Sequence, residues 1–229
     1  MKKIWIWGVI ALLLVAIIPI KHTKLSISRK EYWIRNKDFG EGGWLSSYIQ
    51  INPDIDTVAK QLKSDSEQQS IINAYNWLES NYHYVTDNNI SFSDGTITIH
   101  EHSDYWQSPL LTLAIIKKTG GFYGDCEDGA FLLTSILNAM GYKDVYCEIG
   151  TVTLQSGIYG HAWVVWKNNL LETTRGIPLD YFRKLPAFYS PQFKFNYWET
   201  YEFYGGSMKQ YPLLDSKARK ELLQKLQGG

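Results

Sequence analysis

Residues 124–141 read GDCEDGAFLLTSILNAMG and carry the clearest structural pattern of the chain. The apolar residues of this stretch recur at helical spacing and predict a helix from about Cys126 to Met140, closed by Gly141. The predicted buried stripe consists of Ala130, Leu133, Ile136 or Leu137, and Met140. The sequence therefore predicts one buried helix with a cysteine in its first turn.

Cys126 has a setting that favours a reactive thiol. The thiolate is the nucleophile, and a free cysteine has a pKa of about 8.5. Exposed N–H groups and the dipole at a helix start favour a negative sulfur, and the same N–H groups can hold an oxyanion. The alternative is a buried structural cysteine, but so many polar neighbours argue against packing. These neighbours, Asp125, Glu127 and Asp128, are interpreted first as the N-cap and as residues that offset the dipole.

The remaining pattern predicts an α+β domain in which helices precede an antiparallel sheet. Helical spacing covers residues 56–82 with a break near 64–66, and Pro109 opens a short helix that ends near Lys118. After the central helix, the period changes to that of strands. The predicted strands are 145–149, 161–166 and 170–174, with others near 193–195 and 199–204; residues 88–104 are a hairpin or loop, and 217–226 form a polar helix.

His161 is the predicted base. It begins strand 161–166 directly after Gly160, where an imidazole can point at a neighbouring helix end. It would take the thiol proton and later protonate the leaving group; a surface histidine is the alternative. His100 and His102 flank Glu101, but no third ligand has the spacing of a metal site.

Glu172 is the candidate for the group that orients His161, and the hairpin register decides whether it can do so. If the chain turns at residues 168–169, Glu172 pairs with Val165, about 13 Å along the strand from His161. If the loop spans residues 166–169, Glu172 pairs with Trp163, one pleat from His161 on the same face. Asp180 is the fallback.

The N-terminal residues 4–20 form an uncharged apolar run, IWIWGVIALLLVAIIPI. This length is at the short end for a spanning helix. A cleaved signal peptide is the alternative, but no small-residue cleavage pattern follows. Lysines on both flanks leave the orientation open, and we expect an uncleaved anchor with an extracytoplasmic domain. The expected segments are 1–25 as anchor or signal, 26–54 as linker or irregular wrap, and 55–229 as the folded domain.

The bulk composition excludes several classes of protein. The formal net charge is zero, which argues against a nucleic-acid partner. Two cysteines do not make a disulfide scaffold, and Cys147 lies in an alternating strand where packing is its expected role. The sequence is that of an ordinary globular chain, which we expect to be monomeric.

Three motifs in this order resemble those of the transglutaminase-like superfamily. They are Gly124-Asp125-Cys126-Glu127-Asp128, His161-Ala162-Trp163-Val164 and Glu172-Thr173-Thr174, and the resemblance covers roughly residues 71–174. It implies a papain-like fold and a Cys–His–Asp triad that works through a thioester acyl-enzyme. It also implies that Gln107 or Trp106 assists the oxyanion and that Trp163 contacts the substrate. Two features depart from the family pattern. A glutamate stands at 172 where aspartate is usual, and the hairpin that connects His161 to this acid is shorter than usual.

Within the superfamily, the cysteine motif is similar to that of bacterial periplasmic cysteine proteinases that release surface adhesins. There, acids beside the nucleophile bind calcium, and Asp125 and Glu127 match those positions. The resemblance otherwise requires no cofactor. Calcium takes six or more oxygen ligands, and these two residues begin such a shell.

The function expected from these features is a thiol-dependent peptide or amide hydrolase that acts on a protein or peptide. If the acyl group passes to a lysine instead of water, the protein is a cross-linking transglutaminase. A non-catalytic domain that binds peptide or polysaccharide is a third reading, against which the intact Cys126 and His161 argue.

Overall fold

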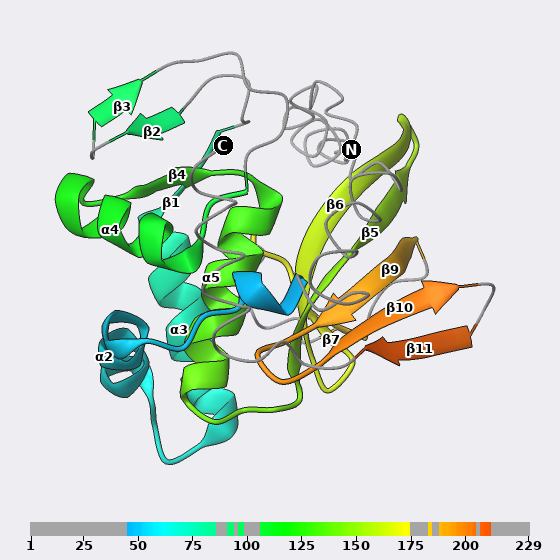
Figure 1. Ribbon diagram of the computed structural model, residues 1–229, viewed down its shortest axis with the longest axis horizontal. Helices are drawn as coiled ribbons and strands as arrows, with labels where there is room; N and C mark the ends of the chain where they lie inside the picture. The colour runs from blue at the N-terminus through cyan, green and yellow to red at the C-terminus, as the bar shows by residue number, and fades with distance from the viewer. Residues whose placement is uncertain are drawn as a thin grey trace, which may run out of the picture.

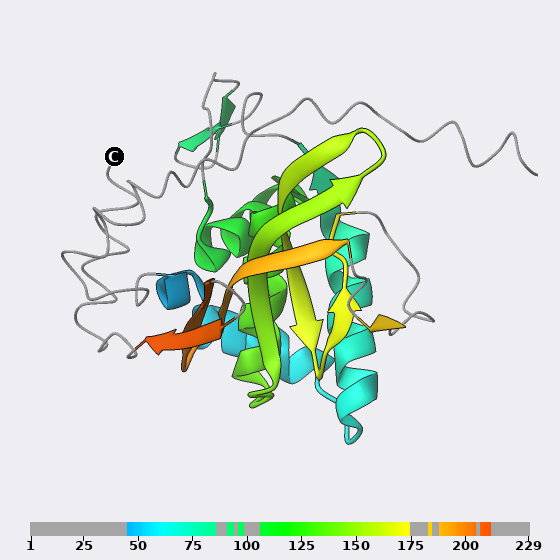
Figure 2. The same cartoon turned by 90° about the vertical axis from the view of Figure 1, so that its right-hand side faces the viewer.

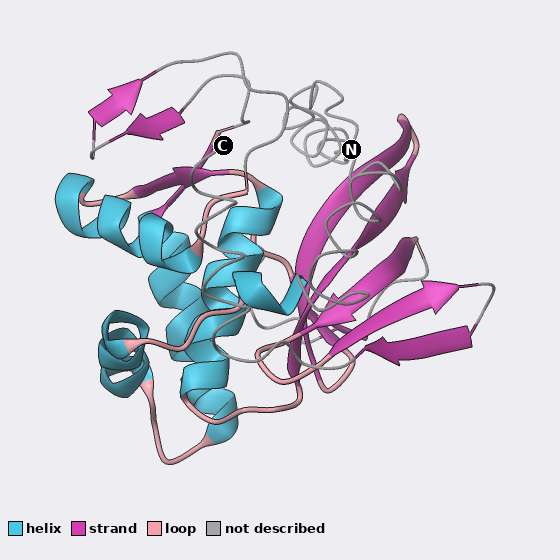
Figure 3. Ribbon diagram, in the orientation of Figure 1, coloured by secondary structure: helices cyan, strands magenta, loops and turns pink. Residues whose placement is uncertain are grey.

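The computed structural model describes residues 45–85, 91–93, 96–98, 106–174, 183–184, 188–204 and 207–211. Helices gather on one side and the strands of the main sheet on the other, while two small sheets lie on the helix side, as Figure 3 shows. The α+β class and the antiparallel sheet predicted from the sequence are confirmed.

Side-chain caps begin the helices. Asn52 accepts hydrogen bonds from the first-turn N–H groups of α2 (Pro53–Leu62), and Ser66 does the same for α3 (Glu67–Asn81). The expected break at 64–66 thus separates two helices. Ser108 caps α4 (Pro109–Thr119), which ends at Gly120 in the left-handed conformation.

The helix α5 (Cys126–Ala139) is the centre of the domain. It packs against α2, α3 and α4 on one side and against β5 and β6 on the other (Figure 1). Every residue from Cys126 to Asn138 is buried, so the helix is covered all round. At its start, Oδ2 of Asp128 accepts a hydrogen bond of 3.3 Å from the backbone N–H of Asp125, which confirms the expected helix boundary.

Seven strands form the main sheet in the order β11-β10-β9-β5-β6-β7-β8, and all neighbours are antiparallel. The long hairpin of β5 and β6 extends beyond the rest, as Figure 2 shows. The sequence prediction missed the halves of β5 and β6 next to this turn because polar and glycine residues interrupt the apolar pattern. The strands are β5 (Val145–Leu154), β6 (Gly157–Trp166), β7 (Asn169–Leu171), β8 (Arg183–Lys184), β9 (Tyr189–Phe195), β10 (Thr200–Tyr204) and β11 (Ser207–Tyr211).

Two small sheets complete the described strands. The strands β2 (Ser91–Ser93) and β3 (Thr96–Thr98) form the hairpin that the sequence left open as hairpin or loop. The strand β1 (Tyr82–Tyr84) pairs in parallel with β4 (Phe122–Gly124), and Tyr84 lies opposite Gly124. This pairing holds the segment that leads into Cys126.

The β6–β7 turn resolves the register of Glu172. Lys167 and Asn168 both have positive φ, and Trp166 pairs with Asn169 across the turn. This register corresponds to the second alternative above, in which Glu172 lies across from Trp163. The strand ends at Leu171, shorter than predicted, so Glu172 follows it directly.

Strand β9 approaches β5 closely at Gly150. A Cβ at this position would lie 2.1 Å from the carbonyl oxygen of Ser190, so only glycine fits there. The β5–β9 register shifts between Ile149 and Gly150. The close approach brings the start of β9, at Tyr189, beside Val152 of β5, near the turn of the hairpin.

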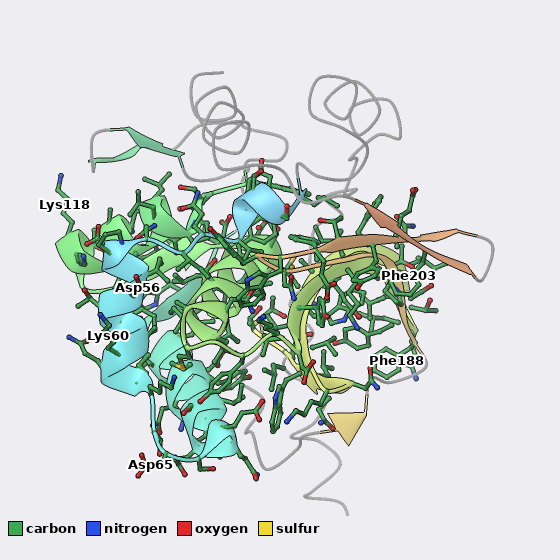
Figure 4. All side chains as sticks on the ribbon, turned by 60° about the horizontal axis from the view of Figure 1, so that its bottom comes forward. Asp56, Lys60, Asp65, Lys118, Phe188 and Phe203 are labelled. Carbon is green, nitrogen blue, oxygen red and sulfur yellow. The ribbon has the colours of Figure 1, made fainter. Side chains whose placement is uncertain are left out.

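The core reaches into the segment predicted as linker or wrap. Leu45, Tyr48 and Ile49 are buried in it, within a short 3-10 helix (Leu45–Tyr48) and the residue after it. Charged residues cover the outer side of the helices, and Figure 4 shows Lys60, Asp65 and Lys118 on this edge, away from Phe188 on the sheet side.

Some predictions concern residues outside the described ranges. They are the apolar run 4–20, residues 26–44, His22, His100, His102, Asp180 and the helix 217–226. Among the residues that are described, no helix has the length and apolarity needed to cross a membrane.

Candidate active site

Cys126 is the first residue of α5, and only 7% of its surface is exposed. The imidazole of His161 and the backbone N–H of Ala162 in β6 both lie close enough to this thiol to lower its pKa. The sulfur also lies 3.3 Å from Oε2 of Glu127. The packing of α5 against β6 therefore brings the cysteine and histidine of separate motifs together.

His161 links the thiol to a carboxylate. Its Nε2 lies 2.9 Å from Oε2 of Glu172, which leaves Nδ1 as the ring nitrogen for the thiol of Cys126. The ring lies at 29° to that of Trp163, with 6.0 Å between their centroids. The imidazole is thus held between two polar partners and an aromatic plane.

Glu172 is buried and its carboxylate is fully engaged. Oε1 accepts hydrogen bonds from the backbone N–H of Thr174 at 3.0 Å and from its hydroxyl at 2.7 Å. Oε2 accepts from the hydroxyl of Tyr189 at 2.6 Å, besides its contact with His161. The structure therefore brings Glu172 to His161, while the alternative Asp180 lies outside the described residues.

The pair of His161 and Glu172 favours the charged forms of both groups. Burial lowers the pKa of His161, but the Glu172 carboxylate and the Cys126 sulfur raise it to about 10. Burial raises the pKa of Glu172, but His161 and the hydrogen bonds from Tyr189 and Thr174 hold it at about 2. An imidazolium beside a carboxylate is therefore the favoured state near neutral pH.

The pKa of the Cys126 thiol depends on contributions that oppose one another. Burial raises the pKa of Cys126, the imidazole of His161 opposes this rise, and the carboxyl of Asp125 adds to it. The sequence predicted a setting that favours the thiolate, whereas in the structure burial makes the largest contribution and the pKa of the thiol is raised. Cys147 is a free, fully buried thiol whose pKa is raised well above its usual value by burial, in keeping with a packing residue.

Two acids beside the thiol offer ligands for a cation. Asp125, Cys126 and Glu127 present ligand atoms within 4.8 Å of one another. Oδ1 of Asp125 and Oε1 of Glu127 are buried without a hydrogen-bond partner, and burial raises the pKa of both carboxyls. Orphaned buried carboxylate oxygens suit a hard cation such as calcium. The two residues therefore fit the beginning of an oxygen-ligated site.

Gln107 and Trp106 do not present free donors of the kind expected from the resemblance. The side-chain nitrogen of Gln107 donates to the carbonyl of Tyr123 and to Oδ2 of Asp128, both at 2.9 Å, so both of its N–H groups are used. Gln107 therefore anchors the start of α5. Trp106 packs edge-on against Tyr48 and Phe131.

The structure corrects the role expected for Trp163. Its side chain is fully buried, so it cannot contact a substrate in this arrangement. Its indole N–H donates to Oε2 of Glu148 at 2.9 Å, and its ring faces His161. Trp163 therefore packs behind the imidazole.

Sequence reasoning missed two tyrosines at the site. The hydroxyl of Tyr189 contacts Glu172, and that of Tyr82 donates to the backbone carbonyl of Asp125 at 3.3 Å. Neither residue stands in a motif, and the sequence carries no signal for them, because both reach the site through strand pairing.

Comparisons with known proteins give a family and a set of solved structures. A family described as "Transglutaminase-like domain" matches residues 53–171. No curated protein matches the chain significantly. Legionella pneumophila LapG, EGTA-treated, is similar at 18% identity and a TM-score of 0.48, over 74% of this chain and 84% of that chain. Calcium-bound LapG from the same organism is similar at 17% identity and a TM-score of 0.48, over 87% of this chain and 99% of that chain.

Proposed function

Because the chain belongs to the transglutaminase-like family, we propose that it is a cysteine peptidase or amidase with Cys126 as nucleophile and His161 as general base. The observation that carries this proposal is the position of His161, which lowers the pKa of the Cys126 thiol and whose Nε2 lies 2.9 Å from Oε2 of the Glu172 carboxylate. A nucleophile, a base and a group that orients the base are the arrangement that thiol catalysis needs.

The proposed reaction has two steps. With the imidazole neutral, the Cys126 thiol passes its proton to His161 as its sulfur attacks the carbonyl carbon of an amide. The C–N bond then breaks, and the resulting imidazolium passes that proton to the leaving amine. His161 then accepts a proton from water as water attacks the thioester, which releases the acid and restores the thiol. Glu172 keeps its charge throughout and stabilises the imidazolium. Because Gln107 uses both of its N–H groups elsewhere, we assign the oxyanion to backbone N–H groups at the start of α5.

An assay that offers the acyl-enzyme both water and a primary amine as acceptors tests this function. The purified full-length protein is incubated with unfolded casein and a fluorescent primary amine, with calcium present, and products are identified by mass spectrometry. We expect new peptide termini, which Cys126→Ala abolishes and the matched Cys147→Ala variant retains. Amine incorporation instead of cleavage would favour the transglutaminase alternative. Saturable binding of peptide or polysaccharide without any new product from the wild type would favour the binding scaffold. Equal cleavage by the wild type and Cys126→Ala would show that Cys126 is not the nucleophile.

We also propose that calcium binds at Asp125 and Glu127. The support is the pair of orphaned, buried carboxylate oxygens beside the thiol. A divalent cation there would supply positive charge next to the sulfur. The carboxyl of Asp125, which now adds to the rise in the Cys126 pKa, would then oppose the thiolate less.

Calcium is therefore expected to raise the melting temperature. At a free concentration about 100 times the dissociation constant, binding adds about 2.7 kcal/mol, or roughly 5–10 °C for a chain of this size. Differential scanning calorimetry with calcium and with EGTA measures the shift. Glu127→Gln should lose it and the exposed control Asp54→Asn should keep it. A shift that survives in Glu127→Gln would place the ion elsewhere.

The cellular setting is also a proposal. The apolar run 4–20 supports a single-pass anchor with the domain outside the cytoplasm, acting on a protein or peptide as a monomer. Protease protection of the domain in intact cells would contradict the outward orientation.

A further inference from the structure

Tyr189 completes the site from a part of the chain that the family match does not reach. The match ends at residue 171, and Tyr189 is the first residue of β9. Its hydroxyl donates to Oε2 of Glu172 at 2.6 Å, and Glu172 and Thr174 also lie past the matched residues. The carboxylate that faces His161 is therefore held by segments beyond the family core.

A glutamate at this position needs more anchoring than the aspartate usual in the family, because it has one more side-chain torsion. Thr174 holds Oε1 with its N–H and its hydroxyl, but Oε2 is the oxygen that meets Nε2 of His161. Tyr189 is the second donor to Oε2. Two donors on one oxygen set its direction more closely than one, and bonds to an ionised oxygen are short and strong.

The hydroxyl of Tyr189 is itself held in place. Its ring meets that of Trp163 edge-on, with centroids 5.0 Å apart, and lies 6.0 Å from the His161 ring. Trp163 is anchored in turn by Glu148. The backbone of Tyr189 pairs with Val152 in β5. The side chain and the backbone of Tyr189 are thus both held in place, so its hydroxyl can fix the position of the Glu172 carboxylate.

We propose that Tyr189 is a positioning residue for the triad. Its hydroxyl keeps Oε2 of Glu172 aimed at Nε2 of His161, and so keeps the other ring nitrogen aimed at Cys126. The inference rests on the proposed function, since it assigns a role within the same site. It makes the start of β9 a working part of the active site and not only a strand of the sheet.

The test compares two tyrosines that make the same kind of bond. Tyr189→Phe removes the hydroxyl and keeps the ring on Trp163. Tyr201→Phe is the matched control, because Tyr201 also donates to a glutamate, Oε2 of Glu199, at 2.6 Å in the same sheet. Alkylation of Cys126 by iodoacetamide at pH 7 is followed by mass spectrometry in the full-length proteins. We expect a rate on the order of tenfold lower for Tyr189→Phe and an unchanged rate for Tyr201→Phe.

A second readout separates positioning from general stability. The proton between His161 and Glu172 should give a downfield NMR resonance in the wild type and in Tyr201→Phe, and exchange broadening should remove it in Tyr189→Phe. A Tyr189→Phe protein with the wild-type alkylation rate and an intact resonance would overturn the inference alone. A wild type in which alkylation does not depend on His161 would overturn the proposed function, and the inference with it.

Discussion

Replacing His161 by alanine is expected to slow the alkylation of Cys126 by roughly a hundredfold at pH 7. The imidazole is the group that lowers the pKa of the buried thiol, against burial and the Asp125 carboxyl, which both raise it. An opposite charge within hydrogen-bonding reach shifts a pKa by about 1–3 units, and each unit changes the thiolate fraction tenfold. Removing His161 leaves only causes that disfavour the thiolate, apart from backbone donors.

The measurement follows iodoacetamide labelling of each cysteine by mass spectrometry between pH 5 and 10. Cys147 serves as an internal control, because it is fully buried and should stay unlabelled in both proteins. The wild-type rate should rise with pH past the usual range of a free thiol, since the pKa of Cys126 is raised. Equal rates in the wild type and His161→Ala would show that the imidazole does not act on the sulfur, and the enzyme proposal would fall.

Replacing Glu172 by glutamine is expected to lower the free energy of unfolding by about 3–5 kcal/mol at pH 5.5, because it breaks a buried ion pair and leaves His161 without its counter-charge. The two side chains are only 14% and 3% exposed, so water screens the pair little.

The pH dependence follows from the two shifts. The pKa of His161 is raised from 6.5 to about 10, so its contribution is complete below 6.5 and is lost as the pH rises through 10. The pKa of Glu172 is lowered from 4.5 to about 2, so its contribution is complete above 4.5 and is lost as the pH falls through 2. Both contributions are complete between about pH 4.5 and 6.5.

Urea unfolding of the full-length proteins at pH 5.5 and 9.5 measures this dependence. The cost of Glu172→Gln should be clearly smaller at pH 9.5. Glu67→Gln is the control, because it breaks a more exposed, solvent-screened pair with Lys167 and should change the free energy of unfolding little at either pH value. A cost for Glu172→Gln that is the same at both pH values would mean that His161 is not charged in the folded protein.

Motif reasoning and geometry diverge at Gln107 and Trp163. Both stand in stretches that resemble the family, and the sequence predicted that they would meet the oxyanion and the substrate. Gln107 instead holds Asp128 and the carbonyl of Tyr123, and Trp163 is buried against Glu148. A motif shows that a residue lies near the site, but the side chain's contacts depend on neighbours from other segments.

Local sequence patterns specify the helices and strands and the reactive residues that they carry. The apolar period of residues 130–140 requires a buried helix, the acids around Cys126 mark its start, and the alternation around His161 requires a strand. These are local properties, because the pattern that predicts a helix or a strand spans only about ten consecutive residues. They were enough to predict the α+β class, the break between α2 and α3, and the two residues of the thiol pair.

The residues that join Cys126 and His161 at the site are brought there by tertiary contacts. The positive φ of Lys167 and Asn168 sets the register that brings Glu172 to His161, where a shift in the turn would have placed it about 13 Å away. The close approach at Gly150 brings Tyr189 to the same carboxylate. Burial then raises the pKa of Cys126, whereas the contact between His161 and Glu172 overrides the effect of burial on both of those groups. Register, strand order and desolvation depend on contacts between residues far apart in the chain, and no local pattern specifies them.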